Sequence, residues 1–170
     1  MLEVVGADPF VSAIWDRMIC CTNMRALRVK CSKNPLLTVE RSGQWKPRMV
    51  YILVANKSYT YKSGRRSRII YIGTTGKGAV RPANSAVSKA SQAFGKLRGV
   101  KTIEVHIATC RGRKRMKTWQ HLESALLATF MGLHFELPVY NKKKGSIRFA
   151  EDISLFRPTS LQKLISRFAD

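Results

Sequence analysis

Five polar residues in the middle of the chain have types that could together hydrolyse a phosphodiester bond. Hydrolysis needs a water that loses a proton, stabilisation of the charged transition state and help for the leaving oxygen. A tyrosine can take that proton when positive charge or a metal-bound water lowers its pKa. A guanidinium fork fits phosphate oxygens, and a carboxylate holds a hard divalent ion. The candidates are Tyr51, Tyr71, Arg81, Glu123 and Asn141.

Each candidate, taken alone, has a simpler interpretation. A tyrosine in a strand usually packs in the core, and an arginine or an asparagine is often a surface or turn residue. Glu123 follows Leu122, which begins an apolar stripe, and a carboxylate beside such a stripe needs a partner. The hypothesis of a common site therefore depends on the fold bringing the five residues together.

The charge balance favours a polyanionic partner. The chain of 170 residues has 31 Lys and Arg against 10 Asp and Glu, a formal net charge of +21. A compact domain with this charge repels itself, and binding to phosphates releases condensed counterions. An acidic membrane surface would be the competing partner, but the sequence has no long basic amphipathic helix and no apolar run of about 18 residues. We therefore expect DNA, or alternatively RNA, as the partner and no membrane.

The basic residues cluster in segments that flank the candidates. A run of lysines is often no more than a solvated face, but three runs around one proposed site favour phosphate contacts. The expected DNA-binding residues are Lys57, Lys62, Arg65, Arg66, Arg68, Lys77, Arg111, Arg113, Lys114, Arg115, Lys117, Lys142, Lys143 and Lys144.

Hydrophobic periodicity predicts an α+β fold with a small three-stranded antiparallel sheet flanked by helices. Strands are expected at 49–55, 69–73 and 100–110, and the first two form a hairpin with a long basic tip at 56–68. Helices are expected at 81–97 and 119–133, with helical additions near both ends of the chain. The predicted organisation is an N-terminal helical extension at 1–47, a core at 48–145 and a C-terminal helical extension at 146–170, with a helix after Pro158.

The four cysteines are interpreted as reduced thiols of a cytoplasmic protein. Cys20, Cys21, Cys31 and Cys110 contain no C-x-x-C pair, and the N-terminus lacks the features of a signal peptide. A zinc site that uses Cys110 and His106 is the alternative, although His106 and His121 are more simply read as structural residues.

The motifs around the candidates resemble those of the GIY-YIG nuclease superfamily, which includes the N-terminal nuclease of the repair protein UvrC, homing endonucleases and restriction enzymes. Tyr71-Ile72-Gly73 matches the second motif, and Val50-Tyr51-Ile52 matches the first in part. Arg81 lies eight residues after Gly73, as in that family. Glu123 begins the run Glu-Ser-Ala-Leu-Leu, and Asn141 ends Pro-Val-Tyr-Asn. The resemblance covers residues 49–142.

This resemblance implies a role for each candidate. Tyr51 would be the general base and Tyr71 would help to place the water. Arg81 would hold the scissile phosphate, and Glu123 would bind one Mg²⁺ or Mn²⁺ ion. Asn141 would fix the final turn or the surroundings of the metal. The chain departs from the family in three places: Pro82 follows Arg81 directly, the tyrosines lie further apart than usual, and Lys77 is the nearest counterpart of a lysine found near the tyrosines.

The resulting hypothesis is a metal-dependent DNA endonuclease of a restriction, homing or structure-specific kind. A homodimer would be needed to cut both strands in one event. The alternative is a non-catalytic DNA- or RNA-binding protein with a nuclease-like fold.

Overall fold

The computed structural model describes residues 47–112, 115–142 and 149–169. All of these belong to one compact unit. The predicted N-terminal helices, the cysteines at 20, 21 and 31, and four of the basic residues (Arg113, Lys114, Lys143 and Lys144) lie outside the described residues. Within the described ranges, no helix has the length and apolar character to cross a membrane.

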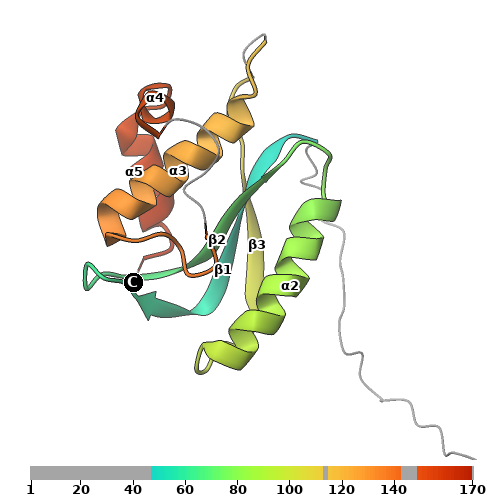
Figure 1. Ribbon diagram of the computed structural model, residues 1–170, viewed down its shortest axis with the longest axis vertical. Coiled ribbons are helices and arrows are strands. Elements are labelled where there is room, and N and C mark those ends of the chain that lie inside the picture. The colour runs from blue at the N-terminus through green and yellow to red at the C-terminus, as the bar shows by residue number, and fades with distance from the viewer. Residues whose placement is uncertain (1–46, 113–114, 143–148, 170) are drawn as a thin grey trace, which may run out of the picture. The chain divides into compact units, whose positions relative to one another are not determined.

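The sheet has three antiparallel strands, as the periodicity predicts. They are β1 (Met49–Thr60), β2 (Arg66–Thr75) and β3 (Ile103–Ala108). Their order is β2-β1-β3, so β1 is central and β2 is an edge strand (Figure 1). In this register Tyr51 lies opposite Gly73 on one side and opposite Ile107 on the other. The predicted α+β fold is therefore confirmed.

The predicted hairpin tip is wrong in extent. The strands continue through much of 56–68, and the turn between them occupies only residues 61–65. Tyr59 pairs with Ser67 and the amide of Tyr61 donates to the carbonyl of Arg65, so the hairpin closes late. Alternating aromatic residues extend the strand here, although the lysines and arginines make the segment look like a loop in the sequence. The third strand is also shorter than the predicted 100–110.

Helices cover both faces of the sheet (Figure 1). On one face, α2 (Val80–Lys96) packs over Tyr51, Leu53 and Ala55. On the other, α3 (Thr118–His134) packs over Val50 and Ile52, with Phe130 fully buried between them. The alternation of β1 side chains between the two faces explains why this strand is apolar throughout.

The C-terminal helices pack into the same core as the sheet. A short helix α4 (Phe149–Ser154) precedes α5 (Pro158–Ser166), which begins with the predicted proline. Leu161 and Ile165 belong to the same buried cluster as Phe130. The amide of Arg68 on β2 also donates to the carbonyl of Phe168 at 2.8 Å. The helical prediction after Pro158 is confirmed, but this segment is part of the same packed unit as the sheet.

Candidate active site

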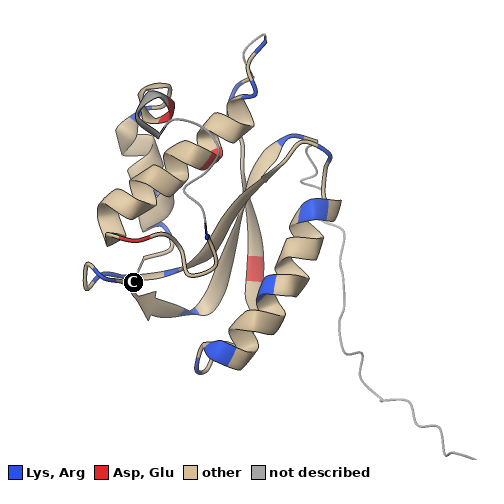
Figure 2. Cartoon of the chain, viewed as in Figure 1, with Lys and Arg blue, Asp and Glu red and all other residues tan. Residues whose placement is uncertain are grey.

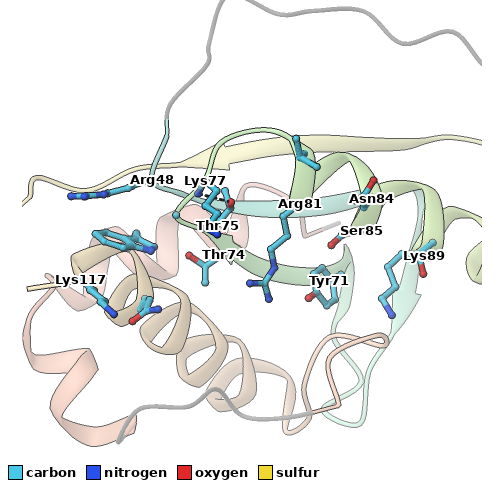
Figure 3. A pocket seen from close by; sticks show the side chains of 15 residues that line it. Arg48, Tyr71, Thr74, Thr75, Lys77, Arg81, Asn84, Ser85, Lys89 and Lys117 are labelled. Carbon is cyan, nitrogen blue, oxygen red and sulfur yellow. Dashed lines mark hydrogen bonds between the residues drawn. The ribbon is translucent and has the colours of Figure 1, made fainter.

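A basic cavity lies beside the edge strand β2, at the end where α2 begins. Its volume is about 1100 Å³, and both Tyr71 and Arg81 line it. Figure 3 shows Arg81 reaching from α2 towards Tyr71 on β2. The other lining residues are Arg48, Thr74, Thr75, Gly76, Lys77, Val80, Asn84, Ser85, Ser88, Lys89, Lys117, Trp119 and Gln120.

The electrostatics of this cavity suit a phosphate. Five of its lining side chains are cationic, and none of the lining residues is acidic. Arg81 lies in the first turn of α2, a helix of 17 residues with no acidic residue in that turn. Helix N-termini attract anions because their first amides lack internal partners. Pro82 causes no break, because a proline fits the first turn of a helix. The guanidinium of Arg81 and the N-terminus of α2 therefore both attract an anion into this cavity.

The loop that leads into α2 is held by three hydrogen bonds. The hydroxyl of Thr75 donates to the carbonyl of Gly78 and accepts from the amide of Lys77. The amide of Gly78 donates to the carbonyl of Pro47. These bonds place Lys77 at the cavity wall, so the resemblance-based candidate is part of the site's surface.

Tyr51 and Tyr71 pack against each other over Gly73. Their ring centroids are 6.0 Å apart. A Cβ atom on Gly73 would lie 2.7 Å from Cζ and Oη of Tyr51 and 2.7 Å from Cε1 of Tyr71. Contacts this short do not occur in folded proteins, so the glycine of the matched motif is what allows the two rings to approach.

The two tyrosines differ in exposure. Tyr71 is half-buried and faces the cavity, whereas Tyr51 is completely buried. A hydrogen bond of 2.8 Å joins the Tyr51 and Ser85 hydroxyls. Burial raises the pKa of Tyr71 to about 12, and the proximity of Tyr51 and Glu123 adds to this while Arg81 opposes it. Tyr71 is therefore a neutral hydroxyl at neutral pH.

Glu123, on α3, is close enough to Tyr71 and Arg81 to interact electrostatically with both. Burial raises its pKa to about 7, and Arg81 opposes that shift. Among the described residues no basic side chain lies within ion-pair distance of Glu123. Glu123 is not itself a lining residue of the cavity, but it acts on both Tyr71 and Arg81, which are. Because β2 is an edge strand, groups from α2 and α3 can meet beside it.

The donor set fits a magnesium-like ion with mostly water and phosphate ligands. No group of three His, Cys, Asp or Glu side chains in the described part of the chain could enclose a metal. Mg²⁺ commonly binds through one or two carboxylates and retains several waters. A buried carboxylate with a raised pKa gains more from a bound cation than a solvated one does. Glu123 is therefore a suitable anchor for such an ion.

Asn141 supports the edge of β2 from outside the sheet. Its Oδ1 accepts from the amide of Ile72 at 2.9 Å, and its Nδ2 donates to the carbonyl of Ile72 at 2.7 Å. The amide of Tyr140 also donates to the carbonyl of Ile70. The side chain of Asn141 thus replaces a neighbouring strand at the residue next to Tyr71. These hydrogen bonds tie the turn at residues 138–141 to β2.

The expected DNA-binding residues divide into separate surfaces. Lys77 and Lys117 line the cavity. The exposed residues Lys62, Arg65 and Arg66 surround the β1–β2 turn, where Figure 2 shows a basic end of the sheet. Lys57 instead lies against Gly99, since a Cβ there would be 2.7 Å from its Nζ. The remaining described residues of the set are Arg68, which is half-buried, and Arg111, Arg115 and Lys142, which are exposed.

The sequence interpretation missed one face of α2. Arg81, Asn84, Ser85, Ser88 and Lys89 all line the cavity, and their spacing of three or four residues places them on one side of the helix. Lys89 also lies over the rings of Tyr71 and Tyr140, with its Nζ 5.6 and 5.8 Å from their centroids. A polar stripe at helical spacing that begins at Arg81 was the signal available.

Trp119 is a further lining residue that the sequence interpretation missed, outside α2. Arg48 lies 4.9 Å above its ring, and a Cβ added to Gly76 would lie 3.8 Å from its Cζ2 and Nε1 atoms. This packing closes the end of the cavity between β1 and α3. No local motif predicts it, because the three residues come together only in the folded chain.

The two histidines considered above have structural contacts. His121 Nδ1 lies 2.5 Å from Oδ1 of Asp152, which joins α3 to α4. His106 Nε2 lies 2.9 Å from Glu104 on the same strand, and its ring packs on Phe168. Both contacts agree with the structural interpretation of these residues.

A comparison with known proteins finds no matching family, no matching curated protein and no matching solved structure.

Proposed function

We propose that this protein is a metal-dependent DNA endonuclease of the GIY-YIG kind. The observation that carries the proposal is that Tyr71 and Arg81 line a cavity with five cationic side chains, and that Glu123 on α3 is close enough to interact electrostatically with both. A cation-lined cavity alone would support only binding. A half-buried carboxylate that interacts electrostatically with two of its lining residues, without a described cationic partner at ion-pair distance, is the feature that favours hydrolysis.

The chain's own residues would divide the work as follows. Arg81 and the first amides of α2 bind the scissile phosphate and stabilise the charge that develops on it. Tyr71 meets the substrate, and its neutral hydroxyl orients the attacking water. Tyr51 is buried behind it, so we assign Tyr51 a positioning role through its contacts with Tyr71 and Ser85. This assignment keeps Tyr71 in the role that the resemblance implies, and it changes Tyr51 from the general base to a positioning residue.

Glu123 would hold the metal, either Mg²⁺ or Mn²⁺. When bound, such an ion polarises the phosphate and lowers the pKa of a coordinated water. Asn141 keeps the backbone around Ile72 in place, which fixes the direction of Tyr71. One site of this kind cuts one strand, so cutting a duplex requires a second protomer or a second binding event. A DNA substrate and reduced thiols are both consistent with the cytoplasm as the compartment.

Nicking of a supercoiled plasmid tests the proposal. Wild-type protein with Mg²⁺ or Mn²⁺ should convert the plasmid to open circles, and Glu123→Ala should reduce this by about 100-fold or more. Glu104→Ala is a matched control, because it removes an exposed carboxylate from β3 outside the cavity. DNA affinity is measured in parallel. If the wild-type protein binds DNA but never nicks it with Mg²⁺ or Mn²⁺, the result would support the alternative of a non-catalytic binding protein.

A further inference from the structure

An exposed aromatic surface lies at the opposite end of the β1–β2 hairpin from the basic cavity. Phe135, at the end of α3, is 71% exposed and Tyr59 on β1 is 41% exposed. Both line an open depression of about 520 Å³, together with Lys62, Pro138 and Asn141. We call Tyr59, Phe135 and Lys62 the aromatic shelf. Nothing in the proposed cleavage chemistry uses these three side chains.

The backbone of Phe135 is unusual for an exposed aromatic residue. Its φ is 60°, in the left-handed region, and its amide donates to the carbonyl of Met131 to close the helix. Glycine or asparagine normally occupies this position, because a side chain there costs free energy. The cost is not recovered by burial, since most of the ring is in solvent. A strained and exposed ring favours a role in binding.

The shelf rests on a rigid base. Tyr59 contacts Tyr61 edge to face, with centroids 5.0 Å apart, and Tyr61 contacts Phe130 in the same way. The hydroxyl of Tyr61 donates to the carbonyl of Ile69 at 2.6 Å. These buried contacts hold Tyr59 in one orientation. A preorganised ring loses little entropy when a second flat group stacks on it.

Hydrogen bonds also fix the basic turn next to the rings. The amide of Lys62 donates to Oε1 of Glu136, and the amide of Ser63 donates to the carbonyl of His134. The carboxylate of Glu136 lies in the depression but is engaged by this amide. Lys62 lines the depression beside the aromatic rings, and the exposed Arg65 and Arg66 line a neighbouring depression on the same turn. Aromatic rings among basic side chains are the composition of surfaces that bind single-stranded nucleic acid.

We propose that the aromatic shelf stacks an unpaired base of the DNA strand whose phosphate enters the basic cavity. The inference deepens the proposed function, on which it rests, by naming the substrate class as DNA with an unpaired segment beside the cleavage site. Tyr71 lies four positions along β2 from Ser67, the partner of Tyr59. That separation is about 13 Å at the usual rise of a strand, or about four nucleotides of B-form spacing.

Equilibrium binding of the full chain tests this inference without any divalent ion. Two DNA probes of the same length are compared, a duplex and a splayed duplex with 2-aminopurine at an unpaired position about four nucleotides from the junction. The wild type should bind the splayed probe at least tenfold more tightly and quench the 2-aminopurine. Phe135→Gly should abolish that preference, because loss of one stacked base weakens binding by about tenfold. Glycine suits the positive φ, so this variant should fold at least as well as the wild type.

Two control variants distinguish the loss of base stacking from a general effect of replacing an exposed ring. Phe135→Trp should retain the preference, and so should Phe94→Ala, which removes a ring that is 51% exposed on α2 and lines neither cavity. An unchanged ratio of the two affinities in Phe135→Gly would overturn the inference. It would also be overturned if Phe135→Gly dissociates a dimer in sedimentation while DNA binding stays the same, since the shelf would then bind a second copy. If the wild-type protein prefers splayed DNA but never nicks the plasmid, the nuclease proposal is refuted and the base-stacking inference is not.

Discussion

Replacement of Gly73 by alanine tests the arrangement of the two tyrosines most directly. The added Cβ would lie 2.7 Å from both rings, which is shorter than side-chain atoms approach in folded proteins. The φ of Gly73 is outside the left-handed region, so alanine is acceptable to the backbone and the whole effect is steric. Tyr51 is fully buried and hydrogen-bonded to Ser85, which limits its movement. Tyr71 must therefore turn away or the strands must separate.

The expected loss of stability is about 1–3 kcal/mol, the usual cost of adding a methyl group to a tightly packed site. This would lower the melting temperature by about 3–10 °C in a domain of this size. The effect on cleavage should be larger, because a displacement of about 1 Å at a reacting group can cost about 100-fold in rate. Tyr51→Phe removes the Oη contact, so in the double variant the two stability losses should be less than additive.

Urea denaturation and the nicking assay measure the two effects separately. Gly95→Ala is the control, since a Cβ at that position in α2 meets nothing within 4 Å. It should raise the free energy of unfolding by about 0.5–1 kcal/mol through helix propensity, with unchanged activity. If Gly73→Ala were as stable and as active as the wild type, the packing of Tyr51 and Tyr71 over Gly73 would be refuted.

Three further predictions concern the charge and the edge of the site. The raised pKa of Glu123 means that the folded protein binds more protons than the unfolded chain between pH 4.5 and about 7. The free energy of unfolding should therefore fall by about 2–3 kcal/mol as the pH rises from 4.5 to about 7. Urea titrations at several pH values should show this slope for the wild type and not for Glu123→Gln. Asn141→Ala leaves the amide and carbonyl of Ile72 without their side-chain partners, so it should lower the free energy of unfolding by about 1–3 kcal/mol. The amide of Ile72 should also exchange its hydrogen faster. An unchanged exchange rate would contradict the edge-supporting role of Asn141. Lys89→Met should weaken DNA binding and reduce the salt dependence by about one counterion, whereas Lys96→Met, in the last turn of α2 and outside the cavity lining, should change neither.

The fold was largely predictable because its core strands and helices carry strong periodic patterns. Apolar alternation places Tyr51 and Ile52 on opposite faces of β1, and both faces are covered by helices. The error in the β1–β2 hairpin arose because basic residues on two-stranded ribbons resemble loop residues in sequence. The packing of Phe168 and Ile165 into the core was not predictable either, since an amphipathic helix does not specify which surface it covers.

The candidate site was predictable as a set of residue types, but its geometry was not. Tyr71 and Arg81, two of the residues chosen for their spacing in the sequence, line the same cavity. The burial of Tyr51 could not be read from its motif, because it depends on α2 closing over that face of the sheet. Burial also decides the environment of Glu123, whose pKa is raised although the chain as a whole is strongly basic. The net charge of the chain therefore does not predict the protonation state of an individual half-buried group.

The outer edge of β2 connects the two surfaces that carry the proposals. An edge strand presents unpaired amides and carbonyls, which proteins usually cover or shorten. Here residues 138–141 cover it, and Asn141 bonds both main-chain groups of Ile72. Asn141 also lines the depression that contains Tyr59 and Phe135, while Ile72 adjoins Tyr71 in the strand. One covering segment thus adjoins the aromatic shelf on one side and supports the residue beside the basic cavity on the other. A DNA strand that contacts both surfaces would run along this segment, so a disturbance at Asn141 should affect cleavage and the preference for unpaired bases together.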